Sequence, residues 1–403
     1  MRIEILCTGD EILTGKTINT NYSHIARRLV EVGLNVTWGT TVGDDRESLL
    51  LAFRQAGERA DAVIVNGGLG PTVDDLSQEV AAQAAGVELV LDEAWLARME
   101  ERYRQRGRVM PPNNIKQAML PAGAEMIDNP IGTACGFAVT LGKARFMFTP
   151  GVPREMRRMI DEQVLPRLLK MSGLQSVTRL KRFHSFGIGE SRADEMLKDI
   201  EAFGDGSVKL GFQSHYPQLE TKLAARAATA ADLDRVLAPV EAEVRARLGA
   251  FILCEDNDTL EGVVLAALAG RGGSLALAET FTSGNIASRL APLPAAEGVF
   301  RRGVVSRDVG EVAASVAQAL RNASGASHGL AVLVALDSGD DRTELGGDIC
   351  IGIADAEGSV TRRARLLGGR DWVRMGAGEL ALDCLRRHLL GLPVDERIDF
   401  EKR

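Results

Sequence analysis

Two segments near the start of the chain combine closely spaced glycines with acidic side chains. The first contains Gly9, Asp10 and Glu11, and the second runs Gly67-Gly68-Leu69-Gly70-Pro71-Thr72 before Asp74 and Asp75. Glycine amides can approach an anion closely, and a helix starting at Asp75 would place positive partial charge beside that anion. Thr72 adds a hydroxyl donor. The second segment is therefore predicted to bind a phosphate group.

The acidic side chains of the two segments need a counterion. Asp10, Glu11, Asp74 and Asp75 would repel a bare pyrophosphate, and a divalent cation, with Asp10 and Asp75 as predicted ligands, would remove that conflict. Such a cation can polarise a P–O bond or generate hydroxide. We therefore predict that these four acids form a catalytic site. The competing interpretation is that Asp74 or Asp75 only caps a helix. The metal stays open, because oxygen ligands suit several hard cations.

Three later segments have the composition of binding loops. Lys116 could neutralise a phosphate or be an ordinary surface lysine. The segment 129–136 is rich in turn-forming residues, and 149–153 precedes Glu155 in the first turn of a helix predicted to run from Pro153 to about Leu169. We expect these segments to border the same ligand.

An alternation of strand and helix patterns must position these loops. The βαβαβ rhythm of the first 85 residues predicts a parallel sheet with right-handed crossovers, with strands at 3–7, 35–42 and 62–65 and helices at 21–32, 47–58 and 75–85. Ligands of such sheets bind beyond the carboxyl ends of the strands. Both glycine segments follow strands and should meet at that edge.

The chain has 403 residues, too many for one hydrophobic core. We predict α/β domains at 1–170, 171–255 and 256–395 and a charged, disordered tail at 396–403.

The net charge of −7 argues against a nucleic-acid or anionic-membrane partner. No signal peptide or long apolar run is evident. Five scattered cysteines indicate free thiols in the reducing cytoplasm: Cys7, Cys135, Cys254, Cys350 and Cys384.

Together these motifs resemble the CinA family, whose N-terminal half is similar to molybdopterin-binding domains. The resemblance rests on the two glycine segments, 19–21, 129–132 and 150–155. It implies a three-layer N-terminal domain that uses a metal to split ADP-ribose, a small-molecule dinucleotide-type substrate, into AMP and ribose 5-phosphate. It also implies a homodimer, and a monovalent cation is a further option. The expected ligand contacts are Gly9, Thr14, Asn21, Gly67, Gly68, Gly70, Pro71, Thr72, Lys116, Asn129, Gly132, Pro150, Gly151 and Glu155.

The resemblance also implies a KH-like middle domain. KH domains clamp a nucleic-acid backbone with a Gly-x-x-Gly loop. The nearest segment here is Gly187-Ile188-Gly189, which lacks that spacing, and residues 172–250 hold equal numbers of basic and acidic side chains. We therefore predict a spacer or dimerisation element without nucleic acid as partner.

The C-terminal third departs from the family's nicotinamide-mononucleotide deamidase. The family motif Ala-Glu-Ser-Cys-Thr-Gly-Gly, whose serine is the nucleophile, is here Ala278-Glu279-Thr280-Phe281-Thr282-Ser283-Gly284. Thr280 replaces the serine, and its methyl group restricts the side chain. Residues 302–308 and 335–339 do not match two further motifs of the family, and no lysine occurs between Lys222 and Lys402. We predict a degenerate site at Glu279, Thr280 and Thr282, with both threonines capping a helix near Ser283.

Three alternatives to metal-dependent ADP-ribose hydrolysis stay open. The N-terminal domain could bind a nucleotide without catalysis, or it could bind molybdopterin, because similar loops serve both ligands. The C-terminal domain could retain residual deamidase activity, since threonine can act as a nucleophile when a base activates it.

Overall fold

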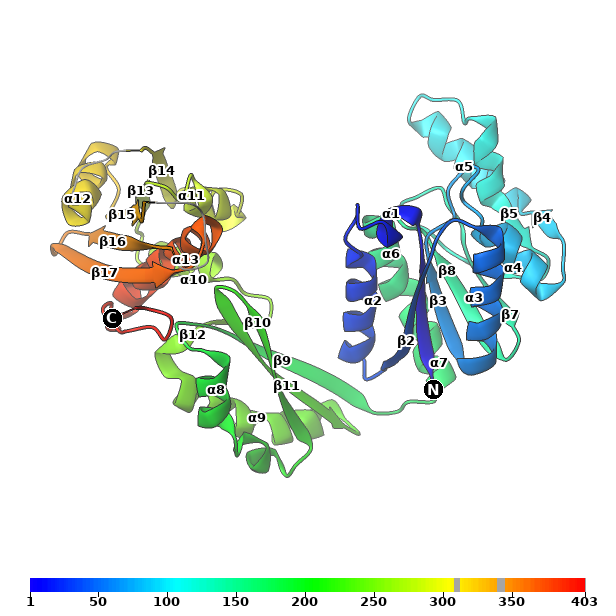
Figure 1. Cartoon of the computed structure of the whole chain (residues 1–403), viewed down its shortest axis with the longest axis horizontal. Helices are drawn as coiled ribbons and strands as arrows, with labels where there is room; N and C mark the ends of the chain where they lie inside the picture. Colours follow the sequence, from blue (N-terminus) through cyan, green and yellow to red (C-terminus); the bar gives the residue numbers. More distant parts are fainter. Residues whose placement is uncertain (308–311, 339–344, 403) are drawn as a thin grey trace. The chain divides into compact units, whose positions relative to one another are not determined.

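The computed structural model describes residues 1–307, 312–338 and 345–402. The chain divides into two compact units, Met1–Thr178 and Arg179–Arg403 (Figure 1). The boundary predicted at 255/256 falls between two sheets inside the second unit. Asp308 and Gly339, which belong to the two failed deamidase motifs, lie outside the described residues.

The first unit is built on a six-stranded sheet of order β2-β1-β3-β8-β7-β6. The first four of these strands run parallel, as predicted. β7 runs antiparallel to β8 because a tight turn at Gly142-Lys143 joins the two strands, and β6 pairs antiparallel with β7. The strands are β1 (Ile3–Thr8), β2 (Val36–Val42), β3 (Ala62–Asn66), β6 (Glu125–Ile127), β7 (Gly136–Leu141) and β8 (Ala144–Thr149). A separate pair joins β4 (Leu89–Leu91) to β5 (Met119–Pro121).

Helices cover both faces of this sheet, so β1 and β3 are buried along their whole length (Figure 1). One face packs against α2 (Thr20–Glu31), α6 (Pro153–Met159), the π-helical η2 (Ile160–Val164) and α7 (Leu165–Ser172). The other face packs against α3 (Arg46–Arg59), α4 (Ser77–Ala85) and α5 (Glu93–Gln105). Short helices occur at α1 (Asp10–Leu13) and η1 (Pro112–Ala118). The predicted three-layer architecture is confirmed.

The helix predicted at 75–85 begins two residues later, at Ser77. The delay has a local cause: the Asp75 carboxylate accepts hydrogen bonds from the amide of Thr72, at 2.9 Å, and from its hydroxyl. These bonds close a turn at 72–75, and turn and helix compete for the same backbone. Asp75 therefore shapes the loop before α4 and does not begin the helix.

The second unit contains two sheets. The four-stranded sheet has the order β10-β11-β9-β12 and packs against α8, η3 and α9. Its elements are β9 (Val177–Phe186), α8 (Glu190–Leu197), η3 (Ile200–Gly204), β10 (Val208–His215), β11 (Gln218–Ala227), α9 (Ala230–Leu248), η4 (Gly249–Phe251) and β12 (Ile252–Glu255).

The five-stranded sheet of the second unit has the order β14-β13-β15-β16-β17. On one face of this sheet, alanines of the strands pack against alanines of α12. On the other face, the strands pack against α10 and α13 in a larger apolar cluster. The elements are α10 (Leu260–Ala269), β13 (Leu275–Glu279), α11 (Asn285–Leu290), η5 (Pro294–Ala296), β14 (Phe300–Val305), α12 (Ala313–Ser324), β15 (His328–Leu336), β16 (Gly346–Ala354), β17 (Ser359–Leu367) and α13 (Arg370–Leu390).

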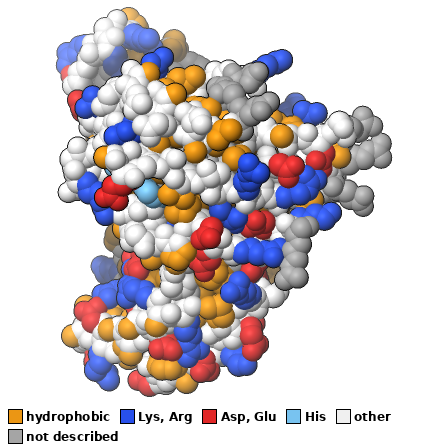
Figure 2. Space-filling view, turned by 90° about the vertical axis from the view of Figure 1, so that its left-hand side faces the viewer, with side chains coloured by type: hydrophobic (Ala, Val, Ile, Leu, Met, Phe, Trp, Pro, Cys, Tyr) orange, Lys and Arg blue, Asp and Glu red, His pale blue; other side chains and the backbone are white. Residues whose placement is uncertain are grey.

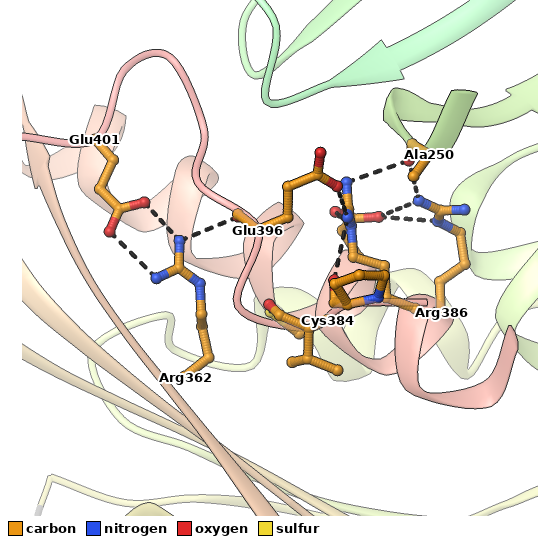
Figure 3. Close-up of polar contacts among 10 residues, drawn as sticks. Ala250, Arg362, Cys384, Arg386, Glu396 and Glu401 are labelled. Atoms are coloured by element: carbon orange, nitrogen blue, oxygen red, sulfur yellow. Dashed lines mark hydrogen bonds and ion pairs between the residues drawn. The ribbon is translucent and has the colours of Figure 1, made fainter. Parts of the chain in front are cut away.

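The prediction that the charged tail is disordered is wrong for its described residues. Ile398 is 2% exposed within the large apolar cluster of the second unit. Glu401 pairs with the buried Arg362 of β17 at 2.5 Å, and Glu396 pairs with Arg387 of α13 (Figure 3). Composition alone suggested disorder, but the apolar Ile398 and Phe400 pack on this cluster, and Asp399 adds a third ion pair with Arg192 at 2.6 Å.

Basic and acidic side chains are interspersed on the face of the molecule shown in Figure 2, with apolar groups between them. The basic side chains on this face therefore lie close to acidic ones, which weakens any field of a single sign. Among the described residues, no helix combines the length and hydropathy that crossing a bilayer requires.

Candidate functional site

The carboxyl ends of β1, β3 and β8 and the loop after β2 border one cleft in the first unit. Its volume is about 410 Å³. Its walls are mostly main chain and carboxylates, including Thr8, Gly9, Glu11, Asp44, Gly67, Gly68, Gly70, Pro71, Asp74, Asp75, Pro150, Gly151 and Glu155. Both glycine segments therefore meet at the predicted edge of the sheet.

The loop after β3 requires glycine at two positions. Gly67 and Gly68 have φ of 112° and 68°, values that residues with a Cβ rarely adopt. A Cβ on Gly67 would lie 2.5 Å from the Thr8 hydroxyl, and one on Gly68 would collide with Ser77. The Ser77 hydroxyl donates to the Gly67 carbonyl at 3.0 Å, and the Ser77 amide donates to the Gly68 carbonyl at 3.1 Å. The start of α4 thus holds this loop.

Three successive amides of this loop are free to bind an anion. Within the described residues, the N–H groups of Gly68, Leu69 and Gly70 have no hydrogen-bond acceptor. Unpaired amides near a protein interior are rare, because each one forfeits its interaction with water. The loop amides themselves, and not the first turn of α4, are the donors that this cleft offers.

Acidic side chains from three loops approach one another at the cleft. Asp44 follows β2, and Asp10 follows β1; the Asp10 amide donates to Asp44 at 3.1 Å and the Asp44 amide donates to Asp10 at 3.2 Å. Burial and the negative charges of Asp10, Glu11 and Asp74 raise the pKa of Asp44. Asp10 and Asp74 therefore lie on the same side of the sheet, although Asp10 does not line the cleft.

Asp74 and Asp75 line the cleft in different electrostatic settings. The Thr72 hydroxyl lowers the pKa of Asp74, whose side chain is exposed. One oxygen of Asp75 is already engaged by Thr72, so this carboxylate has less capacity to bind a ligand or metal. The interpretation that Asp75 caps a helix is therefore wrong, because its carboxylate closes the turn at 72–75 and makes no cap hydrogen bond to α4.

The fit of a divalent cation depends on how many ligands the chain supplies. Within the described residues, no three His, Cys, Asp or Glu side chains are arranged to hold a metal ion. Hard cations such as Mg²⁺ are commonly held by one or two carboxylates together with substrate phosphates and waters. Glu11 and Asp74 fit that role, whereas one oxygen of Asp75 is engaged by Thr72 and the predicted ligand Asp10 faces Asp44 outside the cleft.

Several predicted contacts support the loops without lining the cleft. The Lys116 ammonium donates to the Thr72 carbonyl at 3.0 Å and lies 3.3 Å from Glu79, so its charge is already paired. The Thr14 hydroxyl donates to the Asp10 carbonyl at 2.8 Å. The buried amide of Asn21 donates to Asn66 and to the Gly151 carbonyl, at 2.9 and 2.7 Å.

Asn129 and Gly132 form a second supporting set. The amide group of Asn129 donates to the Ala134 carbonyl at 2.9 Å and to Glu155 at 2.8 Å, and its oxygen accepts from the Gly132 amide at 2.9 Å. A Cβ on Gly132 would overlap the Glu155 carboxylate. These residues therefore position Glu155, which does line the cleft.

The predicted degenerate site in the second unit is buried and internally satisfied. Glu279 accepts hydrogen bonds from the Thr282 hydroxyl at 2.7 Å and from the amides of Ile286 and Ala287 at 3.1 and 2.9 Å. Thr280 accepts from the Val334 amide at 2.9 Å. The prediction that the threonines cap the helix is wrong: Glu279 caps α11, because its longer side chain reaches the free amides of the first turn.

Sequence comparison extends over nearly the whole chain. A CinA-like protein of Frankia casuarinae is 38% identical over 98% of both chains, and one of Shewanella sediminis is 37% identical over 98% of this chain and 97% of its own. The chain belongs to the CinA-like family. Residues 4–170 of this CinA-like chain match the model of a probable molybdopterin binding domain, and 180–253 match the KH domain of damage-inducible protein CinA.

Solved structures match parts of this CinA-like chain. The protein CinA of unknown function from Thermoplasma acidophilum is 35% identical, with a TM-score of 0.37, and covers 43% of this chain and 98% of its own. The molybdopterin biosynthesis enzyme MoaB from Thermus thermophilus is 21% identical, with a TM-score of 0.29, over 43% of this chain and 97% of its own.

Sequence reasoning missed several residues of this CinA-like cleft. Asp44 had a usable signal: it directly follows a strand parallel to β1, and carboxyl ends of parallel strands share one edge. Gln117 carried no such signal, since amide side chains have many roles. The other unnamed lining residues lie in, or directly beside, the segments predicted to border the ligand: Thr8, Leu69, Thr133, Ala134 and Val152.

Proposed function

We propose that the cleft of the first unit binds a pyrophosphate-linked nucleotide of the ADP-ribose type and hydrolyses that link with a divalent cation. The observation that carries the proposal is the run of free amides at Gly68, Leu69 and Gly70, facing a cleft with converging carboxylates. Free amides suit phosphate oxygens, and carboxylates suit a hard cation. One side of a phosphate can thus contact the loop while another contacts the cation.

The hydrolysis needs an orienting loop, a cation and a proton acceptor. Water oxygen bonds to one phosphorus while that phosphorus loses its bond to the bridging oxygen, which leaves on the other phosphate. The products are AMP, ribose 5-phosphate and, with both monoesters as dianions, two protons. A bound cation would polarise the phosphate oxygens, and Glu11 and Asp74 would hold it together with substrate phosphates and waters. Asp44, at the same cleft, is the proposed proton acceptor.

The activity test uses the full chain with ADP-ribose and Mg²⁺, Mn²⁺ or Co²⁺ in turn. AMP release, measured by chromatography, is expected with at least one metal. Glu11→Gln and Asp74→Asn should each slow release about 100-fold or more, because each removes a carboxylate that serves the cation. Glu100→Gln, an exposed acid on α5, is the matched control and should behave as wild type. Absence of AMP with every metal would defeat the proposal.

Binding without turnover is the second candidate, and one observation favours it. The described residues do not supply three metal ligands at one place. If substrate phosphates cannot complete the metal's coordination, the loop amides would bind the nucleotide, or a molybdopterin-type ligand as the family description suggests, without cleavage. Calorimetry that shows ADP-ribose binding with no product after long incubation would favour this candidate.

We further propose that the second unit does not deaminate nicotinamide mononucleotide. The Thr280 hydroxyl is buried and bonded to the backbone of β15, so it is not presented to a substrate. We expect no ammonia release from nicotinamide mononucleotide, measured by a coupled ammonia assay, in wild type or Thr280→Ser. Release above the rate of a heat-denatured sample would contradict this proposal.

A further inference from the structure

A second pocket adjoins the cleft on the side of α5. Its volume is about 510 Å³, and arginines of α5 and α6 dominate its lining. Val152 and Glu155 line both the pocket and the cleft, so the two hollows share a wall. A single ligand of nucleotide size can therefore extend from the cleft into this pocket.

The pocket concentrates positive charge that the chain does not neutralise. The Arg102 guanidinium donates to the carbonyls of Asn129, Pro130 and Gly132 and has no carboxylate partner among the described residues. Burial and the neighbouring charges of Arg98 and Arg106 lower the pKa of Arg102. A guanidinium held by neutral carbonyls keeps its full charge, and it fixes the floor of the pocket.

Two further arginines reach the pocket with their charges unpaired. Within the described chain, the side chains of Arg106, at the end of α5, and Arg154, in the first turn of α6, make no hydrogen bond or ion pair. The one acid of the lining, Glu155, is held by Asn129. Other arginines of α5 are paired: Arg98 with Asp128, and Arg104 with Glu101.

We infer that this arginine pocket binds the phosphate monoester group of a product formed in the cleft, AMP or ribose 5-phosphate; the inference rests on the proposed nucleotide function. Guanidinium groups bind phosphate through paired N–H donors, and two free ones can bind one dianion from two directions. The acid-lined cleft repels a bare phosphate, whereas the adjoining pocket attracts one. The phosphate monoester of a cleavage product is thus drawn towards α5.

Chemical modification of arginine tests this directly in the full chain. Phenylglyoxal should modify Arg106 and Arg154, read by mass spectrometry, at least about threefold more slowly with AMP or ribose 5-phosphate than with adenosine or ribose. The two phosphates distinguish which half of the ligand reaches the pocket. Arg104, exposed on the same helix, should not be protected. Equal modification with phosphates and with their neutral counterparts would overturn the inference.

A binding experiment supplies the second arm. In calorimetry without metal, the double variant Arg106→Gln and Arg154→Gln should bind the protecting phosphate about tenfold or more weakly, and Arg104→Gln should bind it as wild type does. Unchanged affinity in the double variant, or protection by inorganic phosphate alone, would also overturn it. AMP release from ADP-ribose without protection of the arginines would contradict only the phosphate-binding inference. Protection of the arginines without AMP release would contradict only the proposed hydrolysis.

Discussion

At the scale of single residues, side chains that follow one strand of the sheet affect the ionisation of a side chain that follows another strand. Asp44 follows β2, and its pKa is raised first by burial and further by the acids that follow β1 and β3. Parallel strands bring their carboxyl ends together, so like charges accumulate there unless a cation or a positively charged ligand group neutralises them. The ligand-free cleft therefore holds unfavourable electrostatic energy that ligand binding can release.

Substitution of Asp44 should reveal that energy. Because the pKa of Asp44 is raised in the folded chain, its ionised form destabilises the fold above that pKa, and the cost disappears as the pH falls to the ordinary value of about 3.9. Asp44→Asn should raise Tm at about pH 7 and leave it unchanged near about pH 3.5.

Asp45 is the matched control for this experiment. It caps α3 by accepting the Ser48 amide at 2.8 Å, and the hydrogen bonds from Ser48 lower its pKa. Asp45→Asn should therefore leave Tm equal or lower at about pH 7, the opposite sign. A lowered Tm for Asp44→Asn would show that its hydrogen bond to the Asp10 amide outweighs the repulsion.

At the scale of elements, β12 depends on ion pairs that join it to α9 and β9. Glu255 ends β12 and pairs with Arg245 at 2.7 Å and with Lys181 at 2.6 Å. The hydrogen bond from Arg245, with a further one from Lys181, lowers the pKa of Glu255 to about 2, although burial opposes the shift. A short edge strand thereby gains contacts that its few backbone bonds cannot supply.

The Glu255 pairs should make this element sensitive to acid. Their stabilisation is full above the ordinary glutamate pKa of about 4.3 and is lost as the pH falls towards about 2. Glu255→Gln should lower the free energy of unfolding by about 1 kcal/mol at neutral pH, after allowance for solvent screening, and less in acid. Urea titrations at neutral and at acid pH measure this free energy of unfolding. Glu243→Gln, which breaks an i,i+4 pair with Arg247, should cost under about 0.5 kcal/mol.

At the scale of the whole molecule, one apolar cluster explains why two sheets behave as one unit. Phe186 of β9 and Leu253 of β12 share this cluster with α10, α13 and the tail residue Ile398. Buried Arg386 of α13 donates to the Ala250 carbonyl at 2.6 Å, adding a polar link between the two sheets (Figure 3). The first unit has its own clusters on both faces of its sheet.

Truncation of Ile398 should weaken the second unit alone. Ile398→Ala removes a side chain packed against Gly187 and should cost about 2–4 kcal/mol through loss of burial and a residual cavity. Hydrogen exchange read by mass spectrometry should rise within 179–402 and stay unchanged within 1–178. Arg397→Ala, at an exposed neighbour, is the control. Unchanged exchange in the second unit would show that the tail contributes nothing to its stability.

The order of residues along the chain was sufficient to predict the βαβαβ start of the fold and the meeting of the two glycine loops. These features follow from periodicity and from the shared edge of parallel strands, which are properties of neighbouring residues. The arginine pocket and the ordered tail emerged only from three-dimensional packing. They depend on side chains far apart in the chain, such as Arg362 with Glu401, and composition cannot distinguish a solvated charge from one paired across a fold.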